Sequence, residues 1–271
     1  MSRSTCSLCQ FWHSSIGKKI VVALTGAFLV FFLAGHLVGN LLIFQGSEDF
    51  NHYAHFLHTM MHGWGIWIFR ILMLIALVLH IVATIQLTGA NRSARNSRYQ
   101  MDATVVAPKS SRIMIWSGLT ILVFFVFHIL HYTVRIDGEL KDLANYGQNW
   151  AMTVAGFQKW YVVFFYILSM ALLCSHLSHG VASIFQTLGL RTKKTAEGIK
   201  RLSQAYALII FVGFISIPIS ICFFGLGEKE MEDTVKIVKE LKEKGYDELP
   251  ERLIGKNLPE TLKDYPIPRA K

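Results

Sequence analysis

The sequence predicts an all-α membrane protein, a bundle of five transmembrane helices with a charged segment after it. Only 17% of the 271 residues are charged and 52% are apolar, whereas a soluble domain is about 25% charged. Disordered chains are charged and poor in aromatic residues, so this composition also excludes disorder. Four cysteines give no disulfide scaffold.

Five runs without Asp, Glu, Lys or Arg support this fold class, because a helix of ~20 residues crosses the ~30 Å core of a bilayer. Helices are favoured over a β-barrel because the runs show no alternating pattern. The second helix is expected to begin earlier, near Trp64, with Arg70 in its first turns. The first run is too long for a signal peptide and no cleavage site follows it. The runs are 20–47, 71–91, 113–134, 160–190 and 202–227.

The net charge of +9 comes from basic residues in the loops between the uncharged runs. Residues 228–271 hold eleven acids and ten bases, so residues 1–227 hold seven acids and seventeen bases. These bases lie in short loops rather than along one helix or face, as nucleic-acid binding would require. We therefore expect a lipid bilayer as the surrounding medium and no nucleic-acid partner.

The loops predict the orientation. Thirteen bases lie in the N-terminal segment and the loops 92–112 and 191–201, which include Arg92, Arg95, Arg98, Lys109 and Arg112. The other two loops have only Arg135, Lys141 and Lys159. Because Lys and Arg collect on the cytoplasmic side, we expect the N-terminus inside and the C-terminus outside. Tryptophans near the run ends suit the membrane interface: Trp64, Trp67, Trp116, Trp150 and Trp160.

Residues 1–227 thus form the predicted membrane domain, and residues 228–271 a tail on the outer side. In the tail, apolar residues spaced by three or four predict one amphipathic helix over 230–244. Pro250, Pro259, Pro266 and Pro268 predict an extended finish. The simplest interpretation of this segment is a solvated outer tail.

Histidines lie within four of the five runs. Ionisable residues at membrane depth are costly, face the bundle interior and mark functional sites. A single such histidine is usually structural, but histidines on four consecutive helices indicate a site. They are His36 in the first run, His80 in the second, His128 and His131 in the third, and His176 and His179 in the fourth.

Their depths define two pairs. His36 and His128 lie 17 and 16 residues beyond the inner charges, ~25 Å along a helix. His80 lies 12 residues before the next inner charge, and His176 and His179 lie 15 and 12 residues before theirs, or ~18–22 Å. Two imidazoles that face each other across a bundle make a bis-histidine haem site, which serves electron transfer. At this point His131, His176 and His179 all stay open as alternatives.

Small residues accompany these histidines. Gly35, Gly39 and Gly180 would let a flat macrocycle lie against the backbone. Gly26 and Gly118 precede His36 and His128 by ten residues each, so the first and third runs resemble variants of one unit.

The sequence gives less support to proton transport or to a zinc site. The uncharged runs hold no carboxylate, which a proton transporter with histidines would normally place there. No His-Glu-x-x-His pattern indicates zinc catalysis, and Cys6 and Cys9 form a lone C-x-x-C that lacks a second ligand pair. Cys174 and Cys222 are expected to be apolar fillers.

Three segments, GHLVGN (35–40), NRSAR (91–95) and HLSHG (176–180), resemble the cytochrome b558 subunit of succinate dehydrogenase and fumarate reductase. The resemblance covers about residues 14–226. It implies a respiratory complex in the bacterial inner membrane, with a flavoprotein subunit and an iron–sulfur subunit. This chain would be its membrane anchor, carrying two haems b and working with menaquinone.

The resemblance also implies a ligand set. The first and third helices would ligate the distal haem through His36 and His128, and the second and fourth the proximal haem through His80 and His176. The family motif in the fourth helix favours His176, although depth alone slightly favours His179.

This chain departs from some family members in two places. A glutamate proposed to conduct protons is replaced by Cys174, and the quinone-site glutamate near the start of the second helix has no counterpart. The outer loop offers His52, His55 and His58 as candidate proton donors to the quinone instead, with His62 nearby, since histidine titrates in the useful range.

Two alternative functions are a cytochrome b of a hydrogenase or formate dehydrogenase and a histidine-gated transporter. One ligand on each of four helices argues against the first alternative. It also excludes cytochrome b of the bc1 type, which has two ligands on each of two helices. The direction of the reaction, succinate oxidation or fumarate reduction, is not encoded in the anchor.

Overall fold

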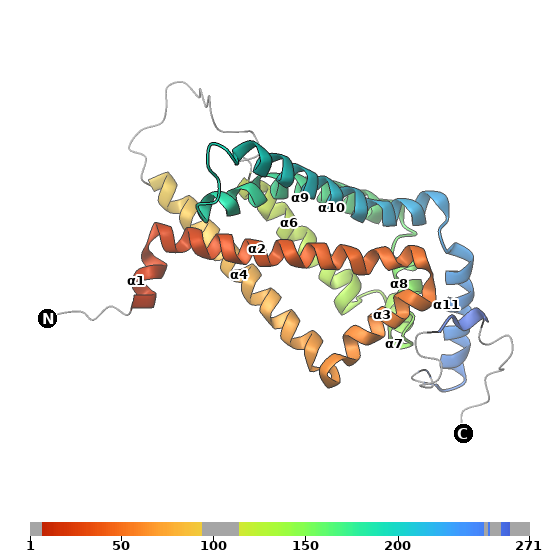
Figure 1. The fold of residues 1–271 in the computed structure, drawn as a ribbon. Coiled ribbons are helices and arrows are strands. Elements are labelled where there is room, and N and C mark those ends of the chain that lie inside the picture. The colour runs from red at the N-terminus through yellow and green to blue at the C-terminus, as the bar shows by residue number, and fades with distance from the viewer. Residues whose placement is uncertain (1–6, 94–113, 247–248, 250–255, 261–271) are drawn as a thin grey trace. The chain divides into compact units, whose positions relative to one another are not determined.

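The computed structural model describes residues 7–93, 114–246, 249 and 256–260 (Figure 1). Within these ranges the chain is helical and contains no strand. Expectations for Arg3, Cys6, Arg95, Arg98, Lys109, Arg112, Pro250, Pro266 and Pro268 concern residues outside the described ranges.

Five helices are long and apolar enough to cross a membrane, which confirms the predicted fold class at this level. Apart from the first and last turns, the backbone N–H and C=O groups of such a helix bond to one another, as the bilayer core requires. These helices are α2, Ser15–Leu41; α4, Trp64–Ser93; α6, Met114–His128; α9, Trp160–Thr187; and α10, Ala196–Phe224. Helix α6 is long enough only together with the helical turn that follows it, as the span Met114–Val134.

Shorter elements connect these helices. Helix α1 (Ser7–His13) precedes α2, and a 3₁₀ turn, η1 (Leu42–Gln45), follows it. Helix α3 (Ser47–Thr59) leads through a second turn, η2 (Met60–Gly63), into α4. In that turn Met61 and His62 have φ of 53° and 56°, a left-handed conformation that side chains rarely adopt. The second long helix therefore begins at Trp64, as predicted.

The third long segment does not stay α-helical to its end. Directly after His128 the backbone widens into a π-helical turn, η3 (Ile129–Val134), which Arg135 closes with φ of 58°. Single π-turns within α-helices often occur at functional sites. Here the turn contains His131.

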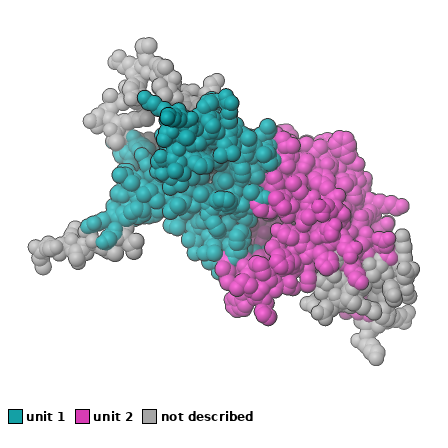
Figure 2. All heavy atoms as spheres, in the orientation of Figure 1, with its two compact units in different colours: residues 1–34, 69–120, 172–210 teal, residues 35–68, 121–171, 211–271 magenta. Residues whose placement is uncertain are grey.

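The described chain divides into two compact units, which Figure 2 colours separately. Unit 1 comprises Met1–Ala34, Phe69–Thr120 and Leu172–Ile210. Unit 2 comprises Gly35–Ile68, Ile121–Ala171 and Phe211–Lys271. Each of the five long helices contributes residues to both units.

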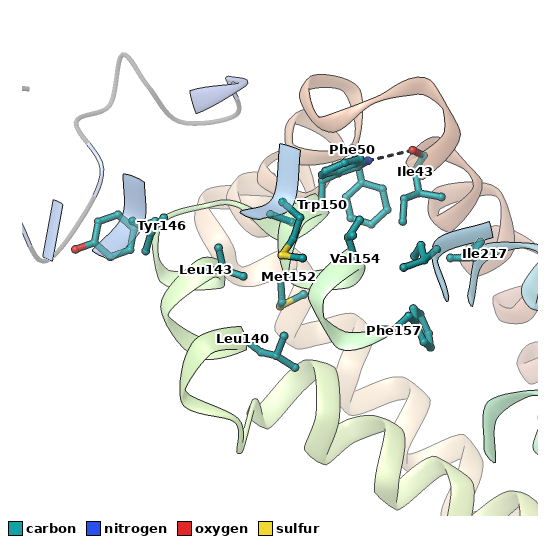
Figure 3. Packing of buried hydrophobic residues seen from close by; sticks show 14 of the residues in the cluster. Ile43, Phe50, Leu140, Leu143, Tyr146, Trp150, Met152, Val154, Phe157 and Ile217 are labelled. Carbon is teal, nitrogen blue, oxygen red and sulfur yellow. Dashed lines mark hydrogen bonds between the residues drawn. The ribbon is translucent and has the colours of Figure 1, made fainter. Parts of the chain in front are cut away.

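The main buried hydrophobic cluster lies in unit 2, where short helices pack around one another. Helix α8 (Asn149–Gly156) packs against α3, α7 (Gly138–Asn145) and α11 (Glu228–Glu243). Nearly all of α8 is therefore buried. Trp150 is 3% exposed and its Nε1–H donates to the Ile43 carbonyl at 3.0 Å (Figure 3). The expectation that Trp150 is an interfacial residue was therefore wrong.

Helix α11 confirms the amphipathic helix predicted in the C-terminal segment. Its apolar face is buried through Met231, Val238 and Leu241 in the same cluster as α8. Lys239 and Lys242 form ion pairs with Glu139 and Asp142 of α7. Only its polar face fits the interpretation of a solvated tail, because the other face has apolar partners. Residues 258–260, which include Pro259, form a helical turn and are not extended.

Candidate functional site

Unit 2 brings together His36 of α2 and His128 of α6. Their ring centroids are 5.9 Å apart and the ring planes meet at 81°. The two residues are 92 positions apart in the sequence, so only the packing of two helices brings the two rings together, edge-on. We call His36 and His128 the unit 2 pair. The structure thus brings together the two residues that depth had predicted to share one site.

Aromatic and polar side chains surround the unit 2 pair. Phe214 of α10 lies 5.7 Å from the His36 ring and Phe124 lies 5.8 Å from the His128 ring, between centroids. Asn40 donates to the His36 carbonyl at 2.7 Å, and its amide nitrogen is 3.3 Å from Nδ1 of His36. The phenolic oxygen of Tyr166 lies 3.2 Å from Nδ1 of His128.

Unit 1 contains His80 of α4 and His176 of α9, which we call the unit 1 pair. The Thr25 hydroxyl of α2 lies 3.2 Å from Nδ1 of His80. The Ser117 hydroxyl of α6 lies 3.1 Å from Nδ1 of His176. As with the unit 2 pair, residues predicted to share a site belong to the same compact unit.

The hydrogen bonds of the neighbouring hydroxyls favour one tautomer of both unit 1 histidines. The Thr25 hydroxyl donates its one proton to the Val21 carbonyl at 2.7 Å, and the Ser117 hydroxyl donates its own to the Met114 carbonyl at 3.0 Å. A hydroxyl that donates to its helix carbonyl can only accept from the imidazole. The ring proton then sits on Nδ1 and the lone pair on Nε2, which is the form that binds a metal through Nε2.

Glycine follows each of these hydroxyl residues and lets the imidazole approach the neighbouring backbone. A Cβ atom at Gly26 would lie 3.2 Å from Cε1 of His80, and one at Gly118 would lie 3.6 Å from Cε1 of His176. The first and third runs therefore do share a local unit. In each, a hydroxyl residue and a glycine contact the histidine of the next long helix.

The other three glycines have two kinds of surroundings. A Cβ at Gly39 would lie 2.5 Å from Cε1 of Tyr53, so this glycine makes room for a tyrosine rather than a macrocycle. Gly35 is exposed, and a Cβ there or at Gly180 would meet no heavy atom within 4 Å.

The two alternative histidines differ in their contacts. Nδ1 of His131 lies 3.1 Å from the Tyr166 oxygen, which also contacts His128. The ring of His179 has no hydrogen-bond partner within the described ranges. Ser117 contacts His176 and not His179, so the contacts favour His176.

The histidines of the connecting helix α3 lie at the surface of unit 2. His52, His55 and His58 are all exposed. The Nδ1–H of His58 donates to the Ala54 carbonyl at 2.8 Å, since a carbonyl only accepts. Tyr53 packs against α2 at Gly39. These positions leave the three histidines accessible to small molecules.

Among the described residues, no three His, Cys, Asp or Glu side chains form a group that would hold a metal ion by themselves. Cys9, Cys174 and Cys222 are free thiols. A haem iron needs only two axial side chains because the porphyrin supplies the other ligands, and neutral imidazoles with engaged Nδ1 atoms fit that role.

Comparisons with protein-family models, with curated proteins and with solved structures gave no match to this chain.

The sequence interpretation missed the residues that contact Nδ1. Thr25 and Ser117 each precede the histidine of their own run by eleven residues, next to the glycines already noted. That repeated Thr-Gly and Ser-Gly pattern is the signal that would have revealed them. Tyr166 has no such signal, because its contact depends on how α9 packs against α6.

Proposed function

We propose that this chain is the dihaem cytochrome b anchor of a succinate:menaquinone oxidoreductase of the succinate dehydrogenase and fumarate reductase class. The unit 2 pair would hold one haem b and the unit 1 pair the other. The chain would pass electrons between an iron–sulfur subunit, itself joined to a flavoprotein, and menaquinone.

One observation carries this proposal. Four histidines, each on a different long apolar helix, fall into two pairs within two separate units, and at His80, His128 and His176 a hydroxyl oxygen that can accept the Nδ1–H lies at Nδ1. A histidine ligand of a metal usually engages its second ring nitrogen in this way, which fixes the ring and raises its basicity. A histidine buried for structural reasons needs one hydrogen bond, but it does not need a second histidine facing it.

Each residue has a definite part in such a site. Thr25 and Ser117 hold the ring proton of His80 and His176 at Nδ1, so that Nε2 can bind iron. Bound haem supplies reversible one-electron chemistry through its iron. Side chains such as Phe124 and Phe214 exclude water from the unit 2 pair and so affect the potential at that site.

The predicted topology gives the electron path a direction. With His36 and His128 on the outer side, electrons from succinate would meet the unit 1 pair first and reach the quinone beside the unit 2 pair. A charge that crosses the membrane gains or loses ~2.3 kcal/mol per 100 mV. A negative cytoplasm would therefore assist succinate oxidation by menaquinone, which is chemically uphill.

A haem count tests the ligand set. The purified chain should show a haem b spectrum in the reduced-minus-oxidised difference, with about two haems per chain. His36→Ala and His128→Ala should lose the same haem, and His80→Ala and His176→Ala the other, whereas the exposed His13→Ala should keep both. A colourless protein would refute the cytochrome proposal.

A second experiment separates this complex from a hydrogenase or formate dehydrogenase. The complex is purified through this chain from its native membrane and its haems are oxidised. Succinate, formate and hydrogen are then added separately. Reduction of the haems by succinate alone supports the proposal, and reduction by formate or hydrogen alone contradicts the assigned partners.

A further inference from the structure

Tyr166 of α9 touches two histidines with a single hydroxyl group. Its phenolic oxygen lies 3.2 Å from Nδ1 of His128 and 3.1 Å from Nδ1 of His131. The side chain is only 7% exposed. Phe124 and Phe157 pack edge-on against its ring, at centroid distances of 5.0 and 4.9 Å, so the hydroxyl is held in place.

The two contacts cannot be chemically equivalent. A phenol has one proton to donate, and a neutral imidazole has one N–H. If Tyr166 donates to one histidine, its oxygen accepts the Nδ1–H of the other. An arrangement in which both imidazoles donate would leave the phenolic proton without an acceptor among the described residues, and a buried unpaired donor costs ~1–3 kcal/mol.

The surroundings decide which histidine is the donor. The His128 ring faces His36 at 5.9 Å, and within the described ranges no ring contact joins His36 to His131. The His131 ring instead stacks against Tyr132 at 4.2 Å in the π-turn. A ligand that acts through Nε2 needs its proton on Nδ1, so His128 as the ligand opposite His36 is the histidine that donates to Tyr166.

We propose that Tyr166 is a positioning residue that selects His128 over His131 as the axial ligand opposite His36. Tyr166 accepts the Nδ1–H of His128, which leaves the Nε2 lone pair for iron. It donates its own proton to Nδ1 of His131, which leaves a proton on Nε2 of His131 and prevents that atom from binding iron. This inference rests on the proposed haem function and adds a residue to it.

The test uses the complete complex with the variant Tyr166→Phe, and Tyr206→Phe as the matched control. Tyr206 is also a tyrosine of a long helix, but its hydroxyl donates to the Val30 carbonyl at 2.5 Å and contacts no histidine. The measurements are the haem content and the midpoint potentials of both haems. Low-temperature electron paramagnetic resonance of the ferric haems gives an independent signature of each axial pair.

We expect Tyr166→Phe to raise the midpoint potential of the haem at the unit 2 pair, because an imidazole without an acceptor at Nδ1 donates less charge to ferric iron. Its paramagnetic signal should shift as well, and its haem should be held ~10–100-fold less tightly. The other haem should keep its potential, and Tyr206→Phe should change neither. Unchanged potential and signal in Tyr166→Phe, with both haems present, would overturn the role of Tyr166 and leave the haem function intact.

A second pair of variants covers the case in which Tyr166→Phe fails to assemble. His131→Leu should keep both haems, because it removes only the acceptor of the phenolic proton. His128→Leu should lose one. The reverse result would show that His131 is the ligand and would overturn the selection. Absence of haem from the unaltered complex would instead refute the proposed function itself.

Discussion

Replacing Thr25 by valine tests whether the hydroxyl residues position the histidine ligands. Valine keeps the shape of threonine but cannot accept a hydrogen bond. In the structure the Thr25 oxygen is 3.2 Å from Nδ1 of His80, and its proton already goes to the Val21 carbonyl. The variant therefore removes the hydroxyl oxygen at Nδ1 of His80 without removing a donor that the imidazole needs.

The expected magnitude follows from the burial of this contact. Loss of the partner of a buried donor costs ~1–3 kcal/mol, and His80 is only half-buried, so a cost of about 1.4 kcal/mol is reasonable. That cost corresponds to about a tenfold change in an equilibrium constant. It agrees with the ~10–100-fold loss of metal affinity seen when such partners are removed.

Haem transfer to an excess of a haem-scavenging globin provides the assay, because it reports the loss of each haem by its spectrum. Thr25→Val should release one haem about tenfold faster and leave the other unchanged, and Ser117→Ala should act on the same haem. Thr88→Val in α4 is the control, since its hydroxyl bonds only the Thr84 carbonyl at 2.9 Å. Equal release rates in Thr25→Val and Thr88→Val would refute the reasoning.

Three further predictions follow from the same observations. Single replacements of His52, His55 and His58 by alanine should lower the rate of quinone reduction. Both haems, and succinate oxidation measured with a soluble dye, should stay normal. Full quinone activity in all three variants would place the proton donor elsewhere. An uncoupler should slow menaquinone reduction by succinate in intact vesicles, and an unchanged rate would contradict the outward electron path. Leu241→Ala should destabilise unit 2 by ~2–5 kcal/mol, because Leu241 is fully buried. Thermal denaturation would measure this loss, with the exposed Lys236→Ala as the control. An unchanged stability would show that unit 2 does not depend on α11.

The predicted orientation has its own check in cross-linking. Lys141 lies exposed on α7, in a loop that the charge distribution places outside. A cross-linker on Lys141 should not reach the iron–sulfur subunit, whereas one on Lys193 or Lys194 should. A cross-link from Lys141 to that subunit would contradict the orientation.

The sequence by itself determined the five long helices and predicted which helices pair their histidines, but it left His131 open beside His128 and His179 open beside His176. An apolar run of about twenty residues has few alternatives to a helix, because the bilayer leaves no partner for an unpaired backbone group. The histidines are separated by intervals of 44, 48 and 48 residues. His128 follows His36 by 92 residues and His176 follows His80 by 96. Two helices and their connections thus return the chain to a similar depth within each pair, so pairing the helices by depth needed no contact information.

Tertiary structure alone decided which atoms touch the imidazoles and what the C-terminal segment does. The partners of Nδ1 at His128 and His176 lie on other helices, and helix rotation, which composition does not encode, brings them into reach. Likewise, α11 shows an apolar stripe in the sequence, but only its packing against α7 and α8 makes it part of the core of unit 2. Trp150 is buried for the same reason: side-chain packing depends on neighbours that are distant in the sequence, whereas helix formation depends on residues that are close.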